Sequence, residues 1–476
     1  MRTAYSVETV RNAEAELMAR LPDGALMQRA AAGLAAACAD LLGRVYGARV
    51  VLLVGSGDNG GDALYAGARL ARRGAGVSAV LLGSRTHEAG LAALLGAGGR
   101  VADDPFEVLA VADLVMDGVT GIGGQGGLRA DAVPVARAAR GSNAAVVAVD
   151  LPSGVEADSG EVRGEALRAD ATVTFGTYKP GLLIDPAREY AGTVRLVGIG
   201  LEEHLPSVPD LEALQHVDVA QLLPVPAAES DKYRRGVVGI AAGSSRYPGA
   251  AVLAVAGALR GGAGAVRYVG PAAEAVIARF PEALVHAGPP AKAGRVQAWV
   301  VGPGLGDELD PVQDVLASDV PVLIDADGLR LLDPAAVRGR SAPTLLTPHA
   351  GEAAALLGVP REEVESARLA SVRELAARYG ATVLLKGSTT LVAAPDHTPV
   401  RVNPMGTPWL ATAGSGDVLS GLAGSLLAAG LEARNAGSVA AYLHGLAARH
   451  AASEGTPITS YEVAAALASA WRDVRD

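Results

Sequence analysis

The sequence is poor in cysteine, in aromatic residues and in long apolar runs. Its single cysteine, Cys38, has no partner for an internal disulfide, so we expect a reduced, cytoplasmic setting. Aromatic residues make up 4% of the chain and are scattered, which leaves no stacking platform for single-stranded nucleic acid. There is no basic block and the formal net charge is -10, which argues against a nucleic-acid partner. Polar residues interrupt the apolar runs before spanning length, and the N-terminus lacks a signal-like apolar core, so we expect no membrane partner.

What the chain does contain is an alternation of strand-like and helix-like segments. Half of its 476 residues are apolar and 60 are glycine, which suits helices packed closely on parallel sheets. Strands are expected at RVVLLV, GVSAVLL, ADLVMD, AAVVAVD and ATVTF. A proline-rich stretch separates two such regions. We therefore predict an N-terminal domain at 1–212, a linker at 213–228 and a C-terminal domain at 229–476.

Three predicted strands of the first half end in polar residues beside glycine loops. The motifs are GSGDNGGD, then MDGVTGIGGQGG, then VDLPSG. The carboxyl ends of parallel strands meet at the edge of a sheet where ligands bind. The residues expected to converge there are Asn59, Asp62, Asp117, Asp150 and Ser153.

The chemistry of this set indicates a bound cation and a phosphate-bearing ligand. Carboxylate, amide and hydroxyl oxygens suit a hard cation and not a soft metal. The N–H groups of two glycine loops can hold a phosphate. A cation would offset the acidic side chains, which otherwise repel such a ligand.

Each signal also has a simpler explanation. An aspartate after a strand often caps the next helix, and glycine-rich turns are common in α/β folds. Three acidic strand ends in one domain are harder to explain in that way. A dehydrogenase fits less well: Gly55, Gly57 and Gly60 match a dinucleotide loop, but the acidic residue expected about 20 residues later is missing. Arg85, near that place, is better explained as a solvated loop residue.

These motifs resemble the signature of the NAD(P)H-hydrate epimerases, a family with a Rossmann-like fold. The family's loop usually carries two asparagines before its glycine pair, and the first of them is Asp58 here. The resemblance implies a K⁺ ion held by Asn59, Asp117 and Ser153, with Asp150 as the acid/base at the hydroxylated ring carbon. The residues that it implies for binding of the hydrated nicotinamide nucleotide are Asp58, Asn59, Gly60, Gly61, Asp62, Gly121, Ile122, Gly123, Gly124, Gln125, Gly126, Gly127 and Asp150.

The second half has a glycine-flanked aspartate in the segment ATAGSGDVLSGLAG. Gly414 and Gly416 allow the backbone N–H groups to face a bound anion. Asp417 is either the N-cap of the next helix or a base that removes a proton from a substrate hydroxyl. The motif alone does not decide between these two roles.

Other polar residues of the second half favour a nucleotide site. A lone histidine in a turn is more often a cap, and a lone lysine at a strand end is usually solvated. Taken together, glycines, hydroxyls and a cation describe a phosphate site with one aspartate for proton transfer. The residues concerned are Gly302, Gly304, Gly306, Asp325, Asp327, His349, Glu352, Lys386, Ser388, Thr389 and Thr390.

The motifs GSSRYPGA, GPGLG, DADGL, TPHAGE and KGSTT resemble the ribokinase-like superfamily, and within it the ADP-dependent NAD(P)H-hydrate dehydratases. Ser415 takes the place of the usual threonine and keeps the hydroxyl. The resemblance implies phosphorylation of the ring hydroxyl by ADP and then loss of phosphate, with Asp417 as the base. It assigns the hydrated dinucleotide to Ala250, Gly306, His349 and Asp417, and ADP to Lys386, Gly387, Ser388, Thr389, Thr390 and Gly416.

The two resemblances together imply repair of hydrated NADH and NADPH (NADHX and NADPHX). We predict two three-layer αβα domains, an N-terminal Rossmann-like parallel sheet and a C-terminal ribokinase-like sheet. The first would interconvert the R and S hydrates, and the second would dehydrate the S hydrate and release AMP and phosphate. We also expect a homo-oligomer, and chemical grounds favour Mg²⁺ at the second site.

Two other interpretations stay open at this point. The second half can be a ribokinase-like small-molecule kinase fused to a nucleotide-binding module, because vitamin-precursor kinases share the G-x-G-D loop. Alternatively, the first half can be a non-catalytic module that only binds a nucleotide or another protein.

Overall fold

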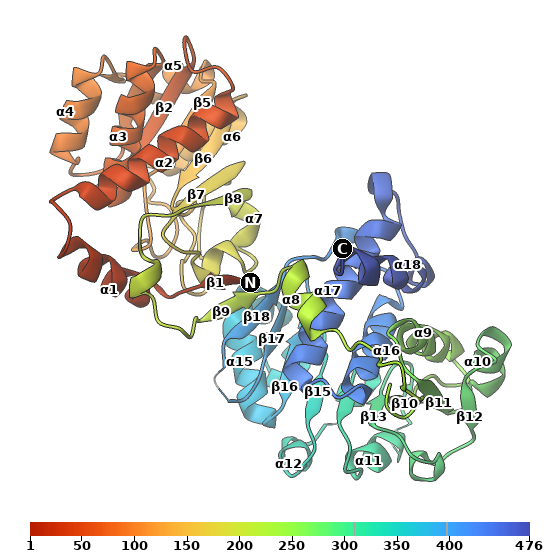
Figure 1. The fold of residues 1–476 in the computed structure, drawn as a ribbon. Helices are drawn as coiled ribbons and strands as arrows, with labels where there is room; N and C mark the ends of the chain where they lie inside the picture. The colour runs from red at the N-terminus through yellow and green to blue at the C-terminus, as the bar shows by residue number, and fades with distance from the viewer. Residues whose placement is uncertain (309, 331, 397) are drawn as a thin grey trace. The chain divides into compact units, whose positions relative to one another are not determined.

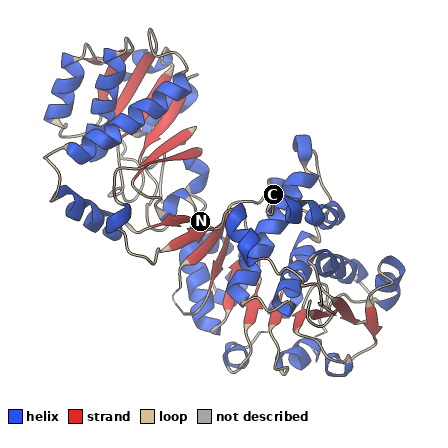
Figure 2. Cartoon of the chain, in the orientation of Figure 1, coloured by secondary structure: helices blue, strands red, loops and turns tan. Residues whose placement is uncertain are grey.

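The chain forms two compact units, which are described separately. The computed structural model describes residues 1–308, 310–330, 332–396 and 398–476. One unit comprises Thr3–Leu211, and the other comprises Glu212–Asp476 with Met1 and Arg2. Both are α/β units with helices on the two faces of a sheet, as predicted (Figures 1 and 2).

The first unit contains a seven-stranded parallel sheet in the order β4-β3-β2-β5-β6-β7-β8. The five strands expected from the sequence are all present. The strands are β2 (Arg49–Val54), β3 (Gly76–Leu81), β4 (Arg100–Val101), β5 (Leu114–Gly118), β6 (Ala145–Val149), β7 (Ala171–Phe175) and β8 (Thr193–Val197). The helices are α1 (Val7–Met18), α2 (Ala25–Leu42), α3 (Asp58–Arg72), α4 (Glu88–Gly96), α5 (Pro105–Ala110), α6 (Val133–Gly141) and α7 (Arg188–Ala191).

Strand β2 shows why this sheet needs a helical layer on each face. Val50, Leu52 and Val54 belong to the core cluster that includes α2 and α3, whereas Val51 and Leu53 belong to the cluster that includes α6. Successive strand residues point to opposite faces, so an unbroken apolar run must be covered twice. Gly67 lets α3 lie close to β2, because a Cβ there would come within 2.5 Å of Leu52 Cδ1.

One helix among the described residues, α2, is long and apolar enough to cross a membrane by length and composition alone. Its inner face, which includes Leu34 and Cys38, is part of the core of the first unit and packs against α3. Its apolar character is therefore explained by packing within the unit.

The larger sheet, most of which belongs to the second unit, has the strand order β1-β9-β18-β17-β16-β15-β14-β13-β10-β11-β12. Strands β10 to β16 pair in parallel, and β17 and β18 add as antiparallel neighbours. The strands are β1 (Arg2–Ala4), β9 (Leu211–Ala213), β10 (Val237–Ala241), β11 (Ala265–Val269), β12 (Leu284–His286), β13 (Ala298–Val301), β14 (Val322–Ile324), β15 (Thr344–Leu346), β16 (Thr382–Leu385), β17 (Thr390–Ala393) and β18 (Val400–Asn403).

Helices cover both faces of this sheet as well. One layer holds α9 (Pro248–Arg260), α16 (Ser415–Ala428), α17 (Ala433–Ala451) and α18 (Ser460–Asp473). The remaining helices are α8 (His216–Leu222), α10 (Ala273–Arg279), α11 (Asp310–Leu316), α12 (Pro334–Arg338), α13 (Ala350–Leu357), α14 (Arg361–Ser366) and α15 (Arg368–Tyr379).

Two glycines bring α9 and α16 into close contact. A Cβ at Gly257 would lie 2.1 Å from the carbonyl oxygen of Val418, and one at Gly421 would lie 1.9 Å from that of Ala254. Only residues without a side chain allow two helix backbones to approach so closely. This crossing fixes α16, and with it the position of Asp417 in the first turn of that helix.

The segment 213–228, which the sequence predicts to be the linker, contains regular structure. It contains the end of β9 and helix α8, which starts at a capping box formed by Gln215 and Asp218. Leu214, Val219 and Leu223 are buried in the main core of the second unit. The prolines flank α8 and do not interrupt it.

Two candidate active sites

Each unit has a point where the chain reverses the direction in which it adds strands to the sheet. In the first unit β2, β3 and β4 extend to one side and β5 then pairs with the other side of β2. In the second unit β10, β11 and β12 extend to one side and β13 returns to pair with β10. The loops that follow the strands diverge at such a switch point, which is where open α/β sheets bind ligands. The predicted residues must therefore be sought at these two places.

In the first unit, Asn59 ties three strand ends together. Its amide nitrogen donates to the carbonyl of Thr120, at 3.0 Å, and to that of Val149, at 2.5 Å. These carbonyls follow β5 and end β6, whereas Asn59 itself is in the first turn of α3, after β2. A Cβ at Gly121 would clash with the Asn59 side chain at 2.6 Å, so the second glycine loop passes directly over it.

Asp117 and Ser153 meet below this loop. The Ser153 hydroxyl donates to Asp117 Oδ1 at 2.6 Å, and the Ser153 N–H donates to Asp117 Oδ2 at 2.8 Å. Both side chains are fully buried. Burial raises the pKa of Asp117 to about 6, although the hydrogen bonds from Ser153 lower it. A cation beside this carboxyl would relieve the cost of its burial.

Asp150 forms a buried ion pair with Lys179, a residue that motif analysis missed. The Lys179 ammonium lies 2.5 Å from Asp150 Oδ1, and the same oxygen accepts from the hydroxyl of Thr174, at 2.9 Å, and the N–H of Phe175, at 3.1 Å. Asp150 also adopts φ +64°, in the left-handed region that non-glycine residues rarely occupy. Such a backbone is maintained where the surrounding contacts fix it, and this is common at functional sites.

The N-terminal helix α1 adds a further carboxyl to this site. Burial raises the pKa of Glu14, and its charge interactions include those with Lys179, Asp150 and Asp58. Arg11 of the same helix lies beside the second glycine loop, because a Cβ at Gly123 would be 2.8 Å from its Nη2. No local motif marks Glu14 or Arg11 as site residues, and only the fold brings α1 to the strand ends.

In the second unit, a buried network surrounds Lys386. Its ammonium donates to Asp325 Oδ1 at 2.7 Å and lies 3.7 Å from the Glu352 carboxylate. Asp325 is fully buried, and its second oxygen accepts from the Ser420 hydroxyl of α16 at 2.6 Å. Burial alone would lower the pKa of Lys386, but the charges of Asp325 and Glu352 outweigh it and raise the pKa. Lys386 is therefore a cation held by two carboxylates, with a side chain that is 20% exposed.

Asp417 lies next to this network. Burial and the negative charge of Asp325 raise its pKa to about 7, whereas Lys386 lowers it. A Cβ at Gly416 would lie 3.5 Å from Lys386 Nζ, so the first turn of α16 passes directly above the ammonium. A helix N-terminus over a cation attracts anions, and a carboxyl with a pKa near 7 can exchange protons at neutral pH.

The loop from Lys386 to Thr390 is held in place by Arg368, a buried arginine of α15. Its Nη2 donates to the carbonyls of Leu385, Lys386 and Thr389, at 3.3, 3.1 and 3.0 Å. Gly387 is required here, because a Cβ would lie 2.3 Å from the same nitrogen. One guanidinium can donate to several carbonyls, and it holds those of this loop on one side. The remaining polar groups of the loop can then contact a ligand.

His349 acts as the N-cap of α13, which is the simpler of its two expected roles. Its Nδ1 accepts from the backbone N–H groups of Gly351 and Glu352, at 3.0 and 3.2 Å. The backbone N–H of His349 donates to the Glu352 carboxylate. The imidazole remains exposed, with Nε2 3.4 Å from Glu352. Capping thus fixes the ring at the site and does not exclude contact with a ligand.

Ala250 and the GPGLG loop line the switch point of the second unit. Gly304 has φ +65°, and a Cβ there would lie 2.6 Å from that of Ala250. The Gly306 N–H donates to Asp327 at 2.9 Å, and a side chain at Gly306 would meet open space. The predicted dinucleotide residues of this unit thus follow strand ends near Asp325, which is next to Asp417.

His444 of α17 is a second buried group that motif analysis missed. Burial lowers its pKa to about 4, a hydrogen bond with the backbone of Ser415 raises it, and the charge of Lys386 lowers it. Its Nε2 has no hydrogen-bond partner in the described part of the chain. His444 is therefore neutral at physiological pH. Its hydrogen bond with the backbone of Ser415 stabilises the start of α16.

Comparison with known proteins identifies both units. The model of the YjeF-related protein N-terminus matches residues 23–181, and the NAD(P)H-hydrate dehydratase model matches residues 238–469. The bifunctional NAD(P)H-hydrate repair enzyme Nnr of Mycobacterium leprae is 50% identical over 468 residues, 96% of each chain. The chain belongs to the family of bifunctional NAD(P)H-hydrate repair enzymes. Its two halves are the epimerase and dehydratase domains of that family.

Other relatives agree with this family. The Nnr protein of Mycobacterium tuberculosis is 52% identical over 442 residues, 90% of each chain. The ADP/ATP-dependent NAD(P)H-hydrate dehydratase of Bacillus subtilis, co-crystallised with ATP and Mg²⁺, is 30% identical. It covers 56% of this chain and 99% of its own, with a TM-score of 0.51. That structure corresponds to one of the two domains of a repair enzyme.

Proposed function

We propose that the chain restores hydrated NAD(P)H in two steps, one in each unit. The first unit interconverts the R and S hydrates, and the second dehydrates the S hydrate with ADP and releases AMP and phosphate. The observation that supports this proposal is that each unit has an aspartate beside a lysine, Asp150 with Lys179 in the first and Asp417 with Lys386 in the second. Substrate binding by the predicted residues of both sites is part of the same proposal.

In the first unit, Asp150 acts as an acid/base group at the ring carbon that carries the hydroxyl. Its Oδ1 accepts hydrogen bonds from three donors, the Thr174 hydroxyl, the Phe175 N–H and the Lys179 ammonium. The loops 58–62 and 121–127 hold the nucleotide through N–H groups.

Asn59, Asp117 and Ser153 suit a K⁺ ion, which is part of this proposal. They bring an amide, a buried carboxyl and a hydroxyl to one place, all with hard oxygen atoms. The carboxyl of Asp117 has no cationic side chain among its hydrogen-bond partners in the described residues. A bound K⁺ would supply the positive charge that this buried group and an incoming phosphate both need.

In the second unit, Asp417 removes the proton from the ring hydroxyl. The freed oxygen attacks the terminal phosphorus of ADP, and the bond to AMP breaks with its electron pair going to AMP. Lys386 and the N–H of Gly416, in the first turn of α16, stabilise the charge that develops on the transferred phosphoryl group. Loss of this phosphate and of a neighbouring ring proton then restores the double bond of NAD(P)H.

Mg²⁺ fits this site only together with the nucleotide. No group of three or more acidic, His or Cys side chains that could hold a metal occurs in the described residues. Mg²⁺ typically binds through one or two carboxylates and the substrate phosphates, and it would neutralise phosphate charge. The carboxylates nearest to the phosphate site are those around Lys386.

We also propose that the chain works in the cytoplasm and as a homo-oligomer. The location is supported by the single cysteine, which is buried and free. Light scattering on the purified chain tests the assembly.

Recovery of reduced-cofactor absorbance from a mixed pool of R and S hydrates tests the whole proposal. With ADP we expect recovery from both epimers, and without ADP only interconversion of R and S. Asp150→Ala should leave recovery from S intact and slow recovery from R. Formation of a stable phosphorylated alcohol without absorbance would instead favour the small-molecule kinase, and unchanged R/S exchange in Asp150→Ala would favour a non-catalytic first half.

Arg368→Ala is expected to weaken ADP binding without removing any group that touches ADP. The loop 386–390 would lose the donor that fixes three of its carbonyls. Part of the binding energy of ADP would then be spent on ordering this loop, which weakens binding. We expect the KM for ADP to rise about tenfold or more, with a smaller change in kcat. Arg373→Ala, an exposed arginine of the same helix, is the matched control and should behave as wild type. A change of kcat alone would contradict this role.

A further inference from the structure

Asp62 is a buried carboxyl that no described residue neutralises. Its side chain is on α3, one turn after the start of the helix, and is 7% exposed. Among the described residues its Oδ1 has no hydrogen-bond partner. The charged groups that face it are Asp58 of α3, Glu14 of α1, Asp150 after β6, and Lys179. Its free oxygen therefore belongs to the same site as the Asp150–Lys179 pair.

The single lysine of this cluster is already used by Asp150. Lys179 is 1% exposed and makes its shortest contact, 2.5 Å, to Asp150 Oδ1. An ionised carboxylate at Asp62 would be buried without a partner, which is costly. Burial, and then the negative charges of Asp150, Asp58 and Glu14, raise the pKa of Asp62 well above its ordinary value. The site thus combines a carboxyl with a raised pKa, Asp62, with a carboxyl that Lys179 pairs, Asp150.

We propose that Asp62 is the second acid/base group of the epimerase site and works as the partner of Asp150. This inference rests on the proposed epimerase function and adds a residue and a proton path to it. Two carboxyl groups with opposite protonation can act as acid and base in one reaction. An epimerase needs both, because a group is lost from one face of a carbon and returns to the other.

The reaction that these two groups support is loss and return of water. Asp62 gives its proton to the ring hydroxyl, the C–O bond breaks with its electron pair on oxygen, and water leaves. The lone pair of the adjacent ring nitrogen forms a C=N bond, and the resulting cation lies beside the Asp150 carboxylate. Water then adds to the opposite face of the planar carbon, and Asp150 takes a proton from it. The other epimer reacts by the reverse sequence, with the roles of the two carboxyls exchanged.

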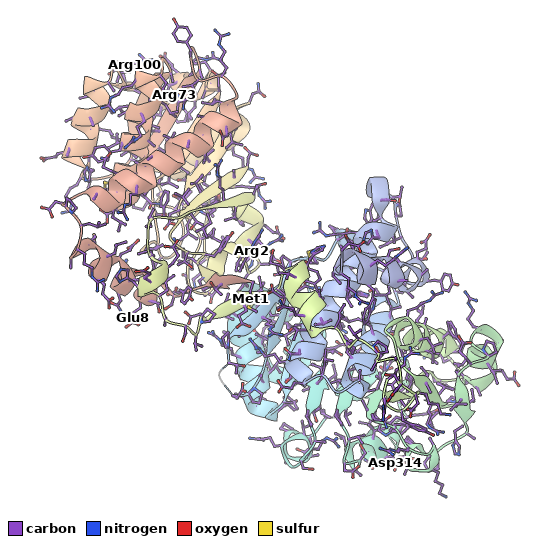
Figure 3. All side chains as sticks on the ribbon, viewed as in Figure 1. Met1, Arg2, Glu8, Arg73, Arg100 and Asp314 are labelled. Carbon is purple, nitrogen blue, oxygen red and sulfur yellow. The ribbon has the colours of Figure 1, made fainter. Side chains whose placement is uncertain are left out.

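The test uses the full-length chain without ADP, so that only interconversion of R and S is measured. Asp62→Asn keeps the shape of the side chain but cannot give up a proton. We expect it to slow interconversion about 10²-fold or more with little change in KM, while recovery from S with ADP stays as in wild type. The matched control is Glu8→Gln, which removes an exposed carboxyl of α1 (Figure 3). Interconversion at the wild-type rate in Asp62→Asn, or a change in KM alone, overturns the proposal.

Isotopic water provides a second test that needs no variant. In water enriched in ¹⁸O, each inversion by the wild-type chain should place one solvent oxygen on the ring carbon, which mass spectrometry detects. Inverted product that keeps its original oxygen overturns the proposed step, whatever the behaviour of Asp62→Asn. Absence of any interconversion above the protein-free rate in the wild-type chain would instead refute the epimerase function itself, so the two failures can be told apart.

Discussion

Asp417→Asn should lower the rate of ADP-dependent recovery of NAD(P)H about 10²- to 10⁴-fold, the contribution typical of a lost general base. The variant keeps the size of the side chain and its place in the first turn of α16. The Lys386 network and the helix N–H groups stay intact, so binding of ADP, measured by calorimetry, should change little. Wild-type turnover in Asp417→Asn would show that another group takes the proton.

The pH dependence of the wild-type chain offers a check on the same residue. Because the pKa of Asp417 is raised to about 7, the base is ionised above that pH and protonated below it. We expect kcat/KM for the S hydrate to be flat at high pH and to fall about tenfold between the plateau and pH 6. Asp327 raises the pKa of Asp417, so Asp327→Asn should move the midpoint to lower pH.

Asp417→Asn should also stabilise the second unit at alkaline pH. In the folded chain Asp417 holds its proton up to about pH 7, whereas an unfolded aspartate loses it near pH 4. Folding therefore takes up a proton between these values, and the free energy of unfolding falls as pH rises through this window. Asparagine removes the effect, so the melting temperature of the variant should exceed that of wild type at pH 8. Such a cost of folding is common for catalytic groups.

The strand ends of both sites were predictable because parallel strands leave a local record. Where an apolar β-branched run stops at a polar residue or a glycine, the sequence indicates the carboxyl end of a strand. In a parallel sheet all these ends lie along one edge. Asn59, Asp117 and Ser153 were expected to meet, and hydrogen bonds tie each of them to the end of another strand. The prolines of the predicted linker at 213–228 do not exclude a helix, and α8 lies between them and the prolines before it.

The groups missed by sequence reasoning are those placed by tertiary structure alone. Glu14 is on a helix far along the chain from the glycine loops, and Arg368 touches its loop only because α15 packs beside β16. His444 similarly reaches Ser415 from α17. No spacing or motif connects these residues to their partners. What a single sequence does offer is a weaker signal: a charged or polar residue inside an apolar segment must find a partner when it is buried.

Lys179 is a buried partner of this kind, and its loss should have a large effect on the stability of the first unit. Lys179→Met should destabilise the first unit by about 3–5 kcal/mol, because it leaves the buried carboxylate of Asp150 without its cation. Calorimetry of the full-length chain measures this: ADP should raise only the transition of the second unit, which identifies the other transition as that of the first. The ADP-sensitive transition then serves as the internal control.

The double variant Asp150→Asn/Lys179→Met separates stability from activity. Removing both charges of a buried pair is often close to neutral, since no unpaired ion remains. We therefore expect the double variant to melt within a few degrees of wild type and yet to lack R/S interconversion. Lys179→Met alone should be both unstable and slow, because Asp150 loses the ammonium that pairs with its carboxyl and holds it in place. If the double variant were as unstable as the single one, the lysine would stabilise the unit through its packing and its contacts with Thr174 and Phe175, and not through its charge.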